Sequence, residues 1–373
     1  LDPAYKTVPQ ALKEAGYRTS LIGKTHWWQA WSWFDTRMES HYDMRGLNQK
    51  LRCYGYDKVW EAGEKRAIGP NRNDYTTFLE EKGYGQSYRN FYEKITGATF
   101  RIQDTILEKF APLPFPEDDQ AEVVLTSKII EEIDRASKEN SPFCINAHYF
   151  APHDPLDSPQ RLLNKVSYEE DDDFVTRKGQ PPLDSNQKKD LWKLRQAYKA
   201  SILLLDEQIG RLFKALDERK LLQDTVIIFT ADHGELMGDH GYTQKGLPWK
   251  QSVQVPTAIY HPDFINKITC DAPVEIIDLC ATILEIAGLD PISALSERWP
   301  SYQDMIPCRS LMPIIRGEVS SVRDYAFSEC DMKWHDEQGY EQWSWQMIVT
   351  KNWKYIRYLD RKAKTPEKSR SEV

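Results

Sequence analysis

The sequence predicts a three-layer α/β/α sandwich around a mainly parallel β-sheet, followed by a small C-terminal antiparallel α+β subdomain. Segments with helical spacing of apolar residues alternate with short, nearly continuous apolar runs, and such runs are typical of parallel strands covered on both faces. Near residue 318 this alternation gives way to strand patterns at 325–328 and 345–358. We therefore expect one α/β domain over 1–318 and a truncated subdomain over 319–373.

The alternating pattern assigns each element of the expected sandwich. Buried strands are expected over residues 17–22, 142–150, 224–230 and 255–260. Helices are expected over residues 7–16, 123–138 and 187–220. The first of these helices has Thr7 as its N-cap, Pro9 in its first turn and Gly16 at its end. Residues 27–116 show weak periodicity, which indicates a loop-rich region with one or two helices.

Composition and charge exclude two classes of protein. The chain has 373 residues and a formal net charge of −8, which argues against a nucleic-acid binder because neutralising phosphates requires a basic face. No apolar run approaches the roughly 20 residues of a membrane span. The chain begins at Leu1, so we expect a periplasmic or secreted protein if an upstream signal has been lost, and a cytoplasmic one otherwise. The localisation stays open, as does the oligomeric state.

Polar side chains follow three of the expected strands at the point where each strand ends. Lys24 and His26 follow the first strand, His153 follows the second, and Asp232 and His233 follow the third. Ligands of open α/β sheets bind at this edge. Because all three clusters are rich in His, Lys and Asp, we expect them to converge in one active site.

These residue types are suited to chemistry on an anionic ester. Asp232 and His233 are adjacent on a turn, where an oxygen and an imidazole nitrogen can face one cation. Lys24 supplies a positive charge for an anion, and Lys245, in a glycine-rich loop, can close on the same anion. The two other histidines can donate hydrogen bonds or move protons. This combination indicates sulfuryl or phosphoryl transfer, in which charge stabilisation carries most of the catalysis.

Several stretches resemble the sulfatase family of the alkaline-phosphatase-like superfamily. Residues 229–241 followed by Lys245 resemble its metal-binding stretch, residues 16–26 its lysine–histidine strand, and residues 149–155 its substrate-histidine loop. Further similar landmarks lie at 198–210, 254–256 and 309–313. The resemblance covers residues 7 to about 318 in the family's order, which makes it specific.

The resemblance implies a role for each candidate residue. It implies metal ligation by Asp232 and His233, neutralisation of the sulfate and the leaving-group oxygen by Lys24 and Lys245, and contacts with substrate oxygens by His26 and His153. One of the two histidines would protonate the leaving group, and Lys24, His153 and Lys245 would bind the substrate. The implied metal is Ca²⁺, with Mg²⁺ or Mn²⁺ as alternatives. The implied substrate is a small-molecule or carbohydrate sulfate ester.

Three functions remain open at this point. Many sulfatases have Asn at the position of His233, and the His form resembles phosphonate monoester hydrolases and choline-sulfatase-like enzymes. The pair of Lys24 and His26 favours sulfate over phosphate or phosphonate esters. A homologue that binds sulfated glycans without cleaving them is the alternative outside enzymes.

The family's nucleophile is a formylglycine made from Cys or Ser in a Cys/Ser-x-Pro/Ala-x-Arg motif. The 373 residues contain no such motif; Cys308-Arg309-Ser310 stands where the family has an ordinary turn. The family also places two aspartate metal ligands on its first strand. We therefore expect the formylglycine and these two ligands upstream of this chain, and we expect the 373 residues alone to be an inactive fragment.

Overall fold

A computed structural model of the chain describes most of its residues. The described ranges are 6–25, 42–65, 71–95, 110–167, 174–176, 182–264, 267–296, 307–336 and 339–359. The chain forms two compact units, Leu1–Gln223 and Asp224–Val373. Among the described helices, none combines the length and the apolar character needed to cross a membrane.

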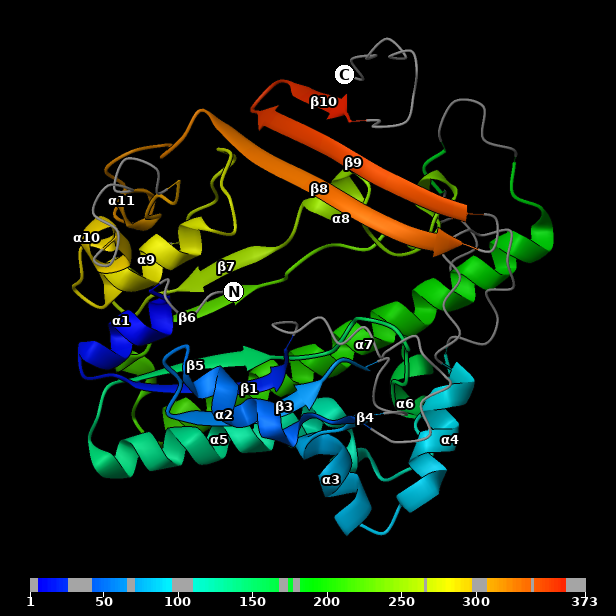
Figure 1. Cartoon of the computed structure of the whole chain (residues 1–373), viewed down its shortest axis with the longest axis horizontal. Coiled ribbons are helices and arrows are strands. Elements are labelled where there is room, and N and C mark those ends of the chain that lie inside the picture. The colour runs from blue at the N-terminus through cyan, green and yellow to red at the C-terminus, as the bar shows by residue number, and fades with distance from the viewer. Residues whose placement is uncertain are drawn as a thin grey trace. The chain divides into compact units, whose positions relative to one another are not determined.

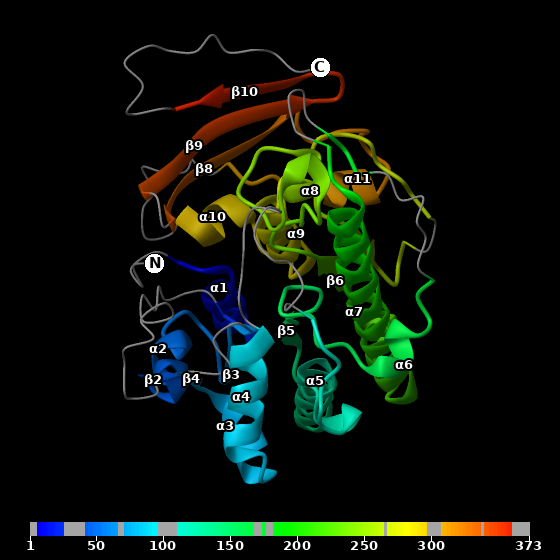
Figure 2. The same ribbon diagram turned by 90° about the vertical axis from the view of Figure 1, so that its right-hand side faces the viewer.

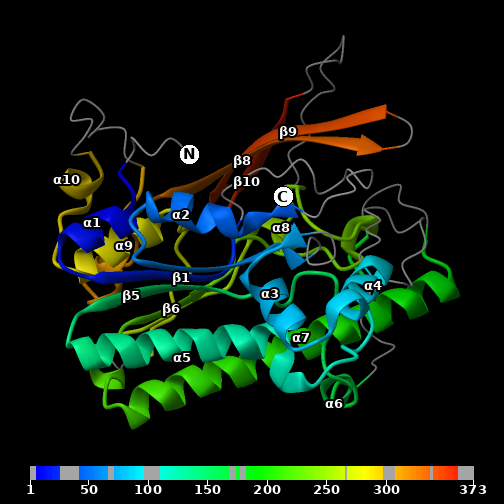
Figure 3. The same ribbon diagram turned by 60° about the horizontal axis from the view of Figure 1, so that its bottom comes forward.

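The first unit contains a parallel sheet between helices. Its strands, in the order β3-β1-β5, are Lys58–Gly63, Arg18–Lys24 and Phe143–His148. The main helices are α1 (Val8–Glu14), α2 (Leu47–Arg52), α5 (Ala121–Glu139) and α7 (Ser185–Glu218). Figure 3 shows α1 and α2 on one side of this sheet and α5, with α7 beside it, on the other. These layers confirm the predicted α/β fold class.

Smaller elements complete the first unit. They are α3 (Asp74–Glu81), α4 (Gly85–Ile95), α6 (Gln160–Leu163) and the short strands β2 (Tyr42–Asp43) and β4 (Asn71–Arg72), which pair with each other. Figure 2 shows α3 and α4 next to each other. The region 27–116, expected to be loop-rich, therefore contains a strand of the main sheet. Its Lys58-Val-Trp-Glu-Ala-Gly63 run is short and carries two charges, so an apolar-run criterion misses β3.

The expected helices begin and end close to their predicted positions. Thr7 caps α1 through a capping box in which its hydroxyl accepts from the Gln10 amide. Asp184 caps α7 in the same way, and α7 is one continuous helix of 34 residues. Residue spacing at 3.6 per turn together with polar caps is a local signal, so the sequence is sufficient to locate these helices.

The described residues of the second unit form two antiparallel sheets. Strands β6 (Ile227–Thr230) and β7 (Thr257–Tyr260) pair with each other, and β8 (Tyr325–Asp336), β9 (Gly339–Thr350) and β10 (Lys354–Tyr358) form the other sheet. Figure 1 shows both sheets. Its helices are α8 (Lys250–Val253), α9 (Asp278–Ile286), α10 (Pro291–Ser296) and α11 (Met312–Ile315). The antiparallel β8-β9-β10 sheet agrees with the strands predicted for the C-terminal region.

Three strands differ from the expectation of deeply buried parallel strands. β6 and β7 run antiparallel to each other, and every residue of β5 keeps part of its surface accessible. Within the described residues, β5 is an edge strand of its sheet and β6 pairs only with β7. An edge strand has a neighbour on one side only, which leaves part of its surface accessible.

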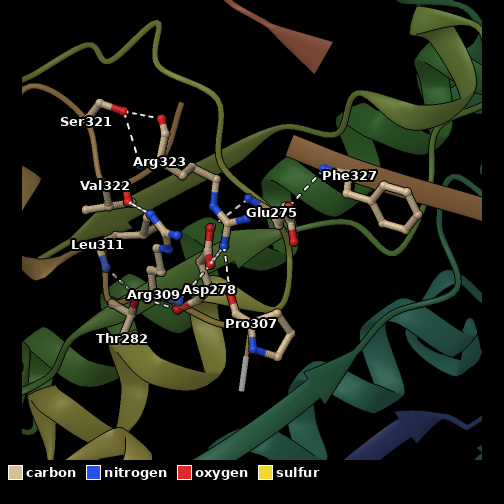
Figure 4. Close-up of polar contacts among 10 residues, drawn as sticks. All are labelled: Glu275, Asp278, Thr282, Pro307, Arg309, Leu311, Ser321, Val322, Arg323 and Phe327. Atoms are coloured by element: carbon tan, nitrogen blue, oxygen red, sulfur yellow. Dashed lines mark hydrogen bonds and ion pairs between the residues drawn. The ribbon is translucent and has the colours of Figure 1, made fainter. Parts of the chain in front are cut away.

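A buried ionic cluster connects three segments of the second unit (Figure 4). The Arg323 guanidinium, which precedes β8, forms ion pairs with Asp278 and Glu275 and donates to the Pro307 carbonyl at 3.0 Å. The Phe327 amide, in β8, donates to Glu275 at 2.8 Å. The start of the C-terminal sheet is thereby attached to the start of α9.

Candidate functional site

The end of strand β1 places Lys24 beside a carboxylate from the neighbouring strand. Lys24 is the last residue of β1 and is in register with Gly63, the last residue of β3. The next residue, Glu64, brings its Oε2 to 3.5 Å from the Lys24 Nζ. Both side chains are buried. The register of two parallel strands therefore produces this ion pair.

The glycine before Lys24 is required by a close backbone approach. Gly23 has φ +114°, and a Cβ there would lie 1.9 Å from the His148 carbonyl oxygen. The strand pairing shifts between Gly23 and Lys24, and the His148 Nδ1 lies 3.0 Å from the Lys24 carbonyl oxygen. The ends of β1 and β5 are thus held tightly together at this edge of the sheet.

His153 faces the same carboxylate as Lys24. Its Nδ1 lies 2.7 Å from the Asp154 carbonyl oxygen, 3.2 Å from the Asp154 Oδ1 and 3.7 Å from the Glu64 Oε1. Because a carbonyl oxygen can only accept, Nδ1 carries the hydrogen in this contact. Nε2 on the opposite side of the ring is then the nitrogen that can exchange a proton with a ligand. Glu64 therefore lies next to two predicted substrate-contact residues.

A fully buried ionic cluster anchors the loop that carries His153. The Lys65 Nζ lies 2.5 Å from the Asp157 Oδ1 and 3.8 Å from the Glu122 Oε1. Glu122 also accepts from the Ala151 amide at 2.9 Å, and Asp157 accepts from the Tyr92 hydroxyl at 2.6 Å. Burial lowers the pKa of Lys65, but the two carboxylates outweigh this effect and leave its pKa raised. Both sides of the loop, at 151 and 157, are thereby attached to Lys65.

A second buried carboxylate holds the residue after Lys24. Glu61 Oε1 accepts from the Thr25 hydroxyl at 2.7 Å and from the Gly63 amide at 2.6 Å. Burial raises the pKa of Glu61 to about 7, the two hydrogen bonds oppose this rise, and the Asp74 carboxylate adds to it. The proton on Glu61 therefore depends on pH near neutrality.

This raised pKa predicts that stability falls as pH rises. The folded state binds a proton on Glu61 up to about pH 7, whereas the unfolded chain releases it near pH 4.5. The free energy of unfolding therefore falls as the pH rises through this window. We expect the free energy of unfolding of Glu61→Gln, which keeps the acceptor oxygen, to rise relative to that of the wild type by about 3 kcal/mol as the pH increases from 5 to 8.5. Urea unfolding measured across this range checks it. The exposed Glu131→Gln is the control, and parallel curves for wild type and Glu61→Gln would contradict the prediction.

In the second unit, Asp232 and His233 turn their side chains towards each other. The His233 amide donates to the Asp232 Oδ1 at 3.0 Å, and the His233 Nε2 lies 3.7 Å from the Asp232 Oδ2. The His233 Nδ1 lies 2.9 Å from the Gly234 carbonyl oxygen, so Nδ1 carries the hydrogen and Nε2 the lone pair. The Asp232 side chain is 63% exposed. One carboxylate oxygen and one imidazole nitrogen therefore lie close together on this turn.

Ser252 connects the Asp-His-Gly turn to the loop of Lys245. The Ser252 carbonyl accepts from the Gly234 amide at 2.8 Å, and its hydroxyl accepts from the Gly246 amide at 3.2 Å. The Leu236 amide donates to the Gln244 carbonyl at 2.8 Å, which closes the intervening loop. Lys245 thus stands in a segment that is attached at both neighbours to the turn that carries Asp232 and His233.

Gly234 is predicted to be intolerant of any side chain. A Cβ there would lie 1.9 Å from the Gln251 carbonyl oxygen, and backbone atoms cannot withdraw as a flexible side chain can. We expect Gly234→Ala to lower the free energy of unfolding by about 1–3 kcal/mol. Gly210→Ala is the matched control, because nothing lies within 4 Å of its Cβ position in helix α7, and it should stabilise the protein by about 0.5–1 kcal/mol. Equal effects of the two changes in urea unfolding would contradict this assignment.

The Asp232–His233 pair fits part of a metal site. A ligating histidine usually donates its second nitrogen to a backbone carbonyl, as His233 does. Among the described residues, no group of three His, Cys, Asp or Glu side chains is arranged to hold a metal ion. Ca²⁺ takes 6–8 oxygen ligands, so a bound ion would need further ligands besides this pair.

The structure places five of the six predicted site residues. It brings Lys24 and His153 to Glu64 in the first unit, and it connects the Asp232–His233 turn to the Lys245 loop in the second. His26 lies outside the described residues. The convergence of all these residues in one site stays a prediction. Sequence reasoning missed the carboxylates Glu61 and Glu64 and the cation Lys65, because it did not identify strand β3, which contains Glu61 and directly precedes the other two.

Comparison with known proteins points to one family. The Sulfatase family model matches residues 1–289. The chain is 26% identical to an arylsulfatase of Clostridium perfringens over 95% of its own length and 69% of that protein, and 29% identical to human iduronate 2-sulfatase over 84% of its own length and 54% of that protein. The chain therefore spans between about half and two thirds of these two relatives.

A solved structure shows the same fold. The phosphonate monoester hydrolase of Agrobacterium radiobacter superposes with a TM-score of 0.63 at 20% identity, over 94% of this chain and 71% of that one. At this identity the likeness concerns the fold alone. It supports the α/β architecture predicted from the alternating helices and strands.

Proposed function

Since the chain belongs to the sulfatase family, we propose that this protein hydrolyses sulfate monoesters, with a small-molecule or carbohydrate sulfate as the substrate. The observation that carries the proposal is the arrangement at the end of β1, where Lys24 and His153 lie at one carboxylate on the sheet edge. A cation and a proton donor side by side are what a departing sulfate ester requires.

In this proposal each side chain has a defined task. Lys24 and Lys245 neutralise the sulfate oxygens and the leaving-group oxygen, and His26 contacts the substrate. When the bond between sulfur and the leaving oxygen breaks, the electron pair stays on that oxygen. His153 gives it the proton from Nε2 and becomes neutral. This assignment is supported by the hydrogen on Nδ1, which is held by the Asp154 carbonyl and leaves Nε2 as the exchanging nitrogen.

The remaining groups of the mechanism concern the metal and the nucleophile. Asp232 and His233 would hold a divalent cation, Ca²⁺ in preference to Mg²⁺ or Mn²⁺, which when bound polarises the ester oxygens. The nucleophile in this proposal is a formylglycine, and the 373 residues contain no Cys/Ser-x-Pro/Ala-x-Arg motif that would produce one. We therefore propose that the 373-residue chain by itself hydrolyses sulfate esters at a negligible rate.

A phosphonate or phosphate ester hydrolase is the second candidate. The observation that favours it is His233. Many sulfatases have Asn at this position, whereas the His form resembles the branch that includes phosphonate monoester hydrolases. A non-catalytic protein that binds sulfated glycans is the third. The three candidates differ in which ester, if any, is cleaved.

The test measures hydrolysis of 4-nitrophenyl sulfate and of a 4-nitrophenyl phosphonate ester. Two samples are compared. The first is a form of the protein that contains these 373 residues together with a formylglycine, and the second is the 373-residue chain alone. We expect sulfate cleavage by the first form only, and we expect Lys24→Ala to lower its kcat/KM by about 100-fold or more. The exposed Lys138→Ala on helix α5 is the control. Preference for the phosphonate ester would support the second candidate, and binding without turnover the third. Robust turnover by the 373-residue chain alone would overturn the formylglycine assignment.

A further inference from the structure

Glu64 has no task in the mechanism proposed above, although it lies next to two of its residues. It follows β3, and its side chain is only 2% exposed. One carboxylate oxygen lies 3.5 Å from the Lys24 Nζ and the other 3.7 Å from the His153 Nδ1. Two groups with different predicted tasks, on different strand ends, thus share one buried carboxylate.

We propose that Glu64 is a positioning residue that holds His153 in the charged form with Nε2 as its proton-donating nitrogen, and that holds the Lys24 ammonium beside it. This inference rests on the proposed function, because the task of a charged His153 is to protonate the leaving oxygen. Glu64 itself touches no reacting atom in this proposal.

The charges around His153 explain why Glu64 has this effect. Glu64 faces the imidazole from the end of β3, and Asp154 faces it from its own loop at 3.2 Å. Each of these carboxylates also interacts with a cation: Lys24 pairs with Glu64, and Lys65 acts on Asp154. An opposite charge within about 4 Å of a buried group favours its charged form. Two carboxylates at Nδ1 therefore stabilise the imidazolium.

The same contacts direct the imidazole ring. With Nδ1 turned to the Asp154 carbonyl and the two carboxylates, the ring presents Nε2 on its opposite side. A general acid needs both a suitable protonation state and a fixed direction of its proton. Glu64 contributes to both, and its backbone position is set by the pairing of β3 with β1.

The first experiment does not depend on hydrolysis. The imidazole signals of the 373-residue chain are followed by NMR as a function of pH. The signal of His153 is identified as the one that is missing in the His153→Gln variant. We expect Glu64→Gln, which is isosteric and neutral, to lower the titration midpoint of His153 by about 1 to 3 pH units. We expect Glu64→Asp, which keeps the charge at a greater distance, to lower it by less. An unchanged midpoint in both variants would overturn the proposal.

The second experiment separates this inference from the proposed function. In the form that carries a formylglycine, kcat for 4-nitrophenyl sulfate is measured against pH. Because the acid must be protonated, the fall of kcat at high pH should move to lower pH in Glu64→Gln, by the same interval as the midpoint. A uniform loss of kcat without such a shift would indicate a merely structural role and overturn the proposal. A shifted NMR midpoint in a protein that cleaves no sulfate ester would support the role of Glu64 at His153 while rejecting sulfate hydrolysis.

Discussion

Lys65→Met is expected to lower the free energy of unfolding by about 3–5 kcal/mol, the usual effect of removing one partner from a buried ion pair. The Lys65 side chain is 1% exposed and faces Asp157 and Glu122. Methionine fills a similar volume but leaves both carboxylates without this cation. The loss should therefore come from uncompensated charge and not from a cavity.

The pH dependence of this loss identifies its cause. Burial already raises the pKa of Glu122, and Lys65 opposes that rise. In Lys65→Met the opposing charge is gone, so Glu122 keeps its proton to a higher pH in the folded state than in the unfolded chain. The destabilisation should consequently shrink as the pH is lowered from about 8 to about 5. Urea unfolding at several pH values measures it.

Lys128→Met is the matched control for this experiment. Lys128 forms an exposed ion pair with Glu131 on helix α5, and exposed pairs contribute about 0–1 kcal/mol. The same change of side chain thus tests a buried and an exposed ammonium group. A loss below 1 kcal/mol in Lys65→Met, or one independent of pH, would contradict the role of Lys65 as the anchor of the His153 loop.

Arg323→Met is the second large effect, expected at about 3–5 kcal/mol in the second unit for the same physical reason. Figure 4 shows the guanidinium between Glu275 and Asp278. Asp278 is fully buried and also accepts from the Arg309 amide at 2.8 Å. Removing the guanidinium leaves the buried Asp278 and the partly buried Glu275 without this cation, and Glu275 also holds the start of β8 through the Phe327 amide.

Arg323→Lys should recover only part of this stability. A guanidinium presents several donors in one plane and can bind two carboxylates and a carbonyl together, whereas an ammonium acts as a point charge. Urea unfolding measures the global effect, and hydrogen exchange at the Phe327 amide reports the local one. Arg309→Met is the control, since its side chain is exposed and donates to the Val322 carbonyl at 2.7 Å. Full recovery by lysine would show that charge alone accounts for the cluster.

The sequence was sufficient to identify the features that depend on neighbouring residues. The N-cap at Thr7, the spacing of apolar residues in α5 and the turn at Asp232 and His233 are all encoded within a few positions. The predicted helix over 123–138 corresponds to α5 at Ala121–Glu139. The sequence also led to the fold class and to the family, because the motifs occur in a fixed order along the chain.

Only the tertiary structure identified the groups that surround the predicted site. Glu64 meets Lys24 because β1 and β3 pair in parallel with Lys24 opposite Gly63, although the two residues are forty positions apart. Lys65 meets Asp157 across 92 positions. Strand register and the burial of charge depend on distant segments, so no local pattern of residues reveals them. The sequence by itself therefore identified the candidate side chains for the predicted chemistry, and the packing of distant strands decided which buried charges lie beside them.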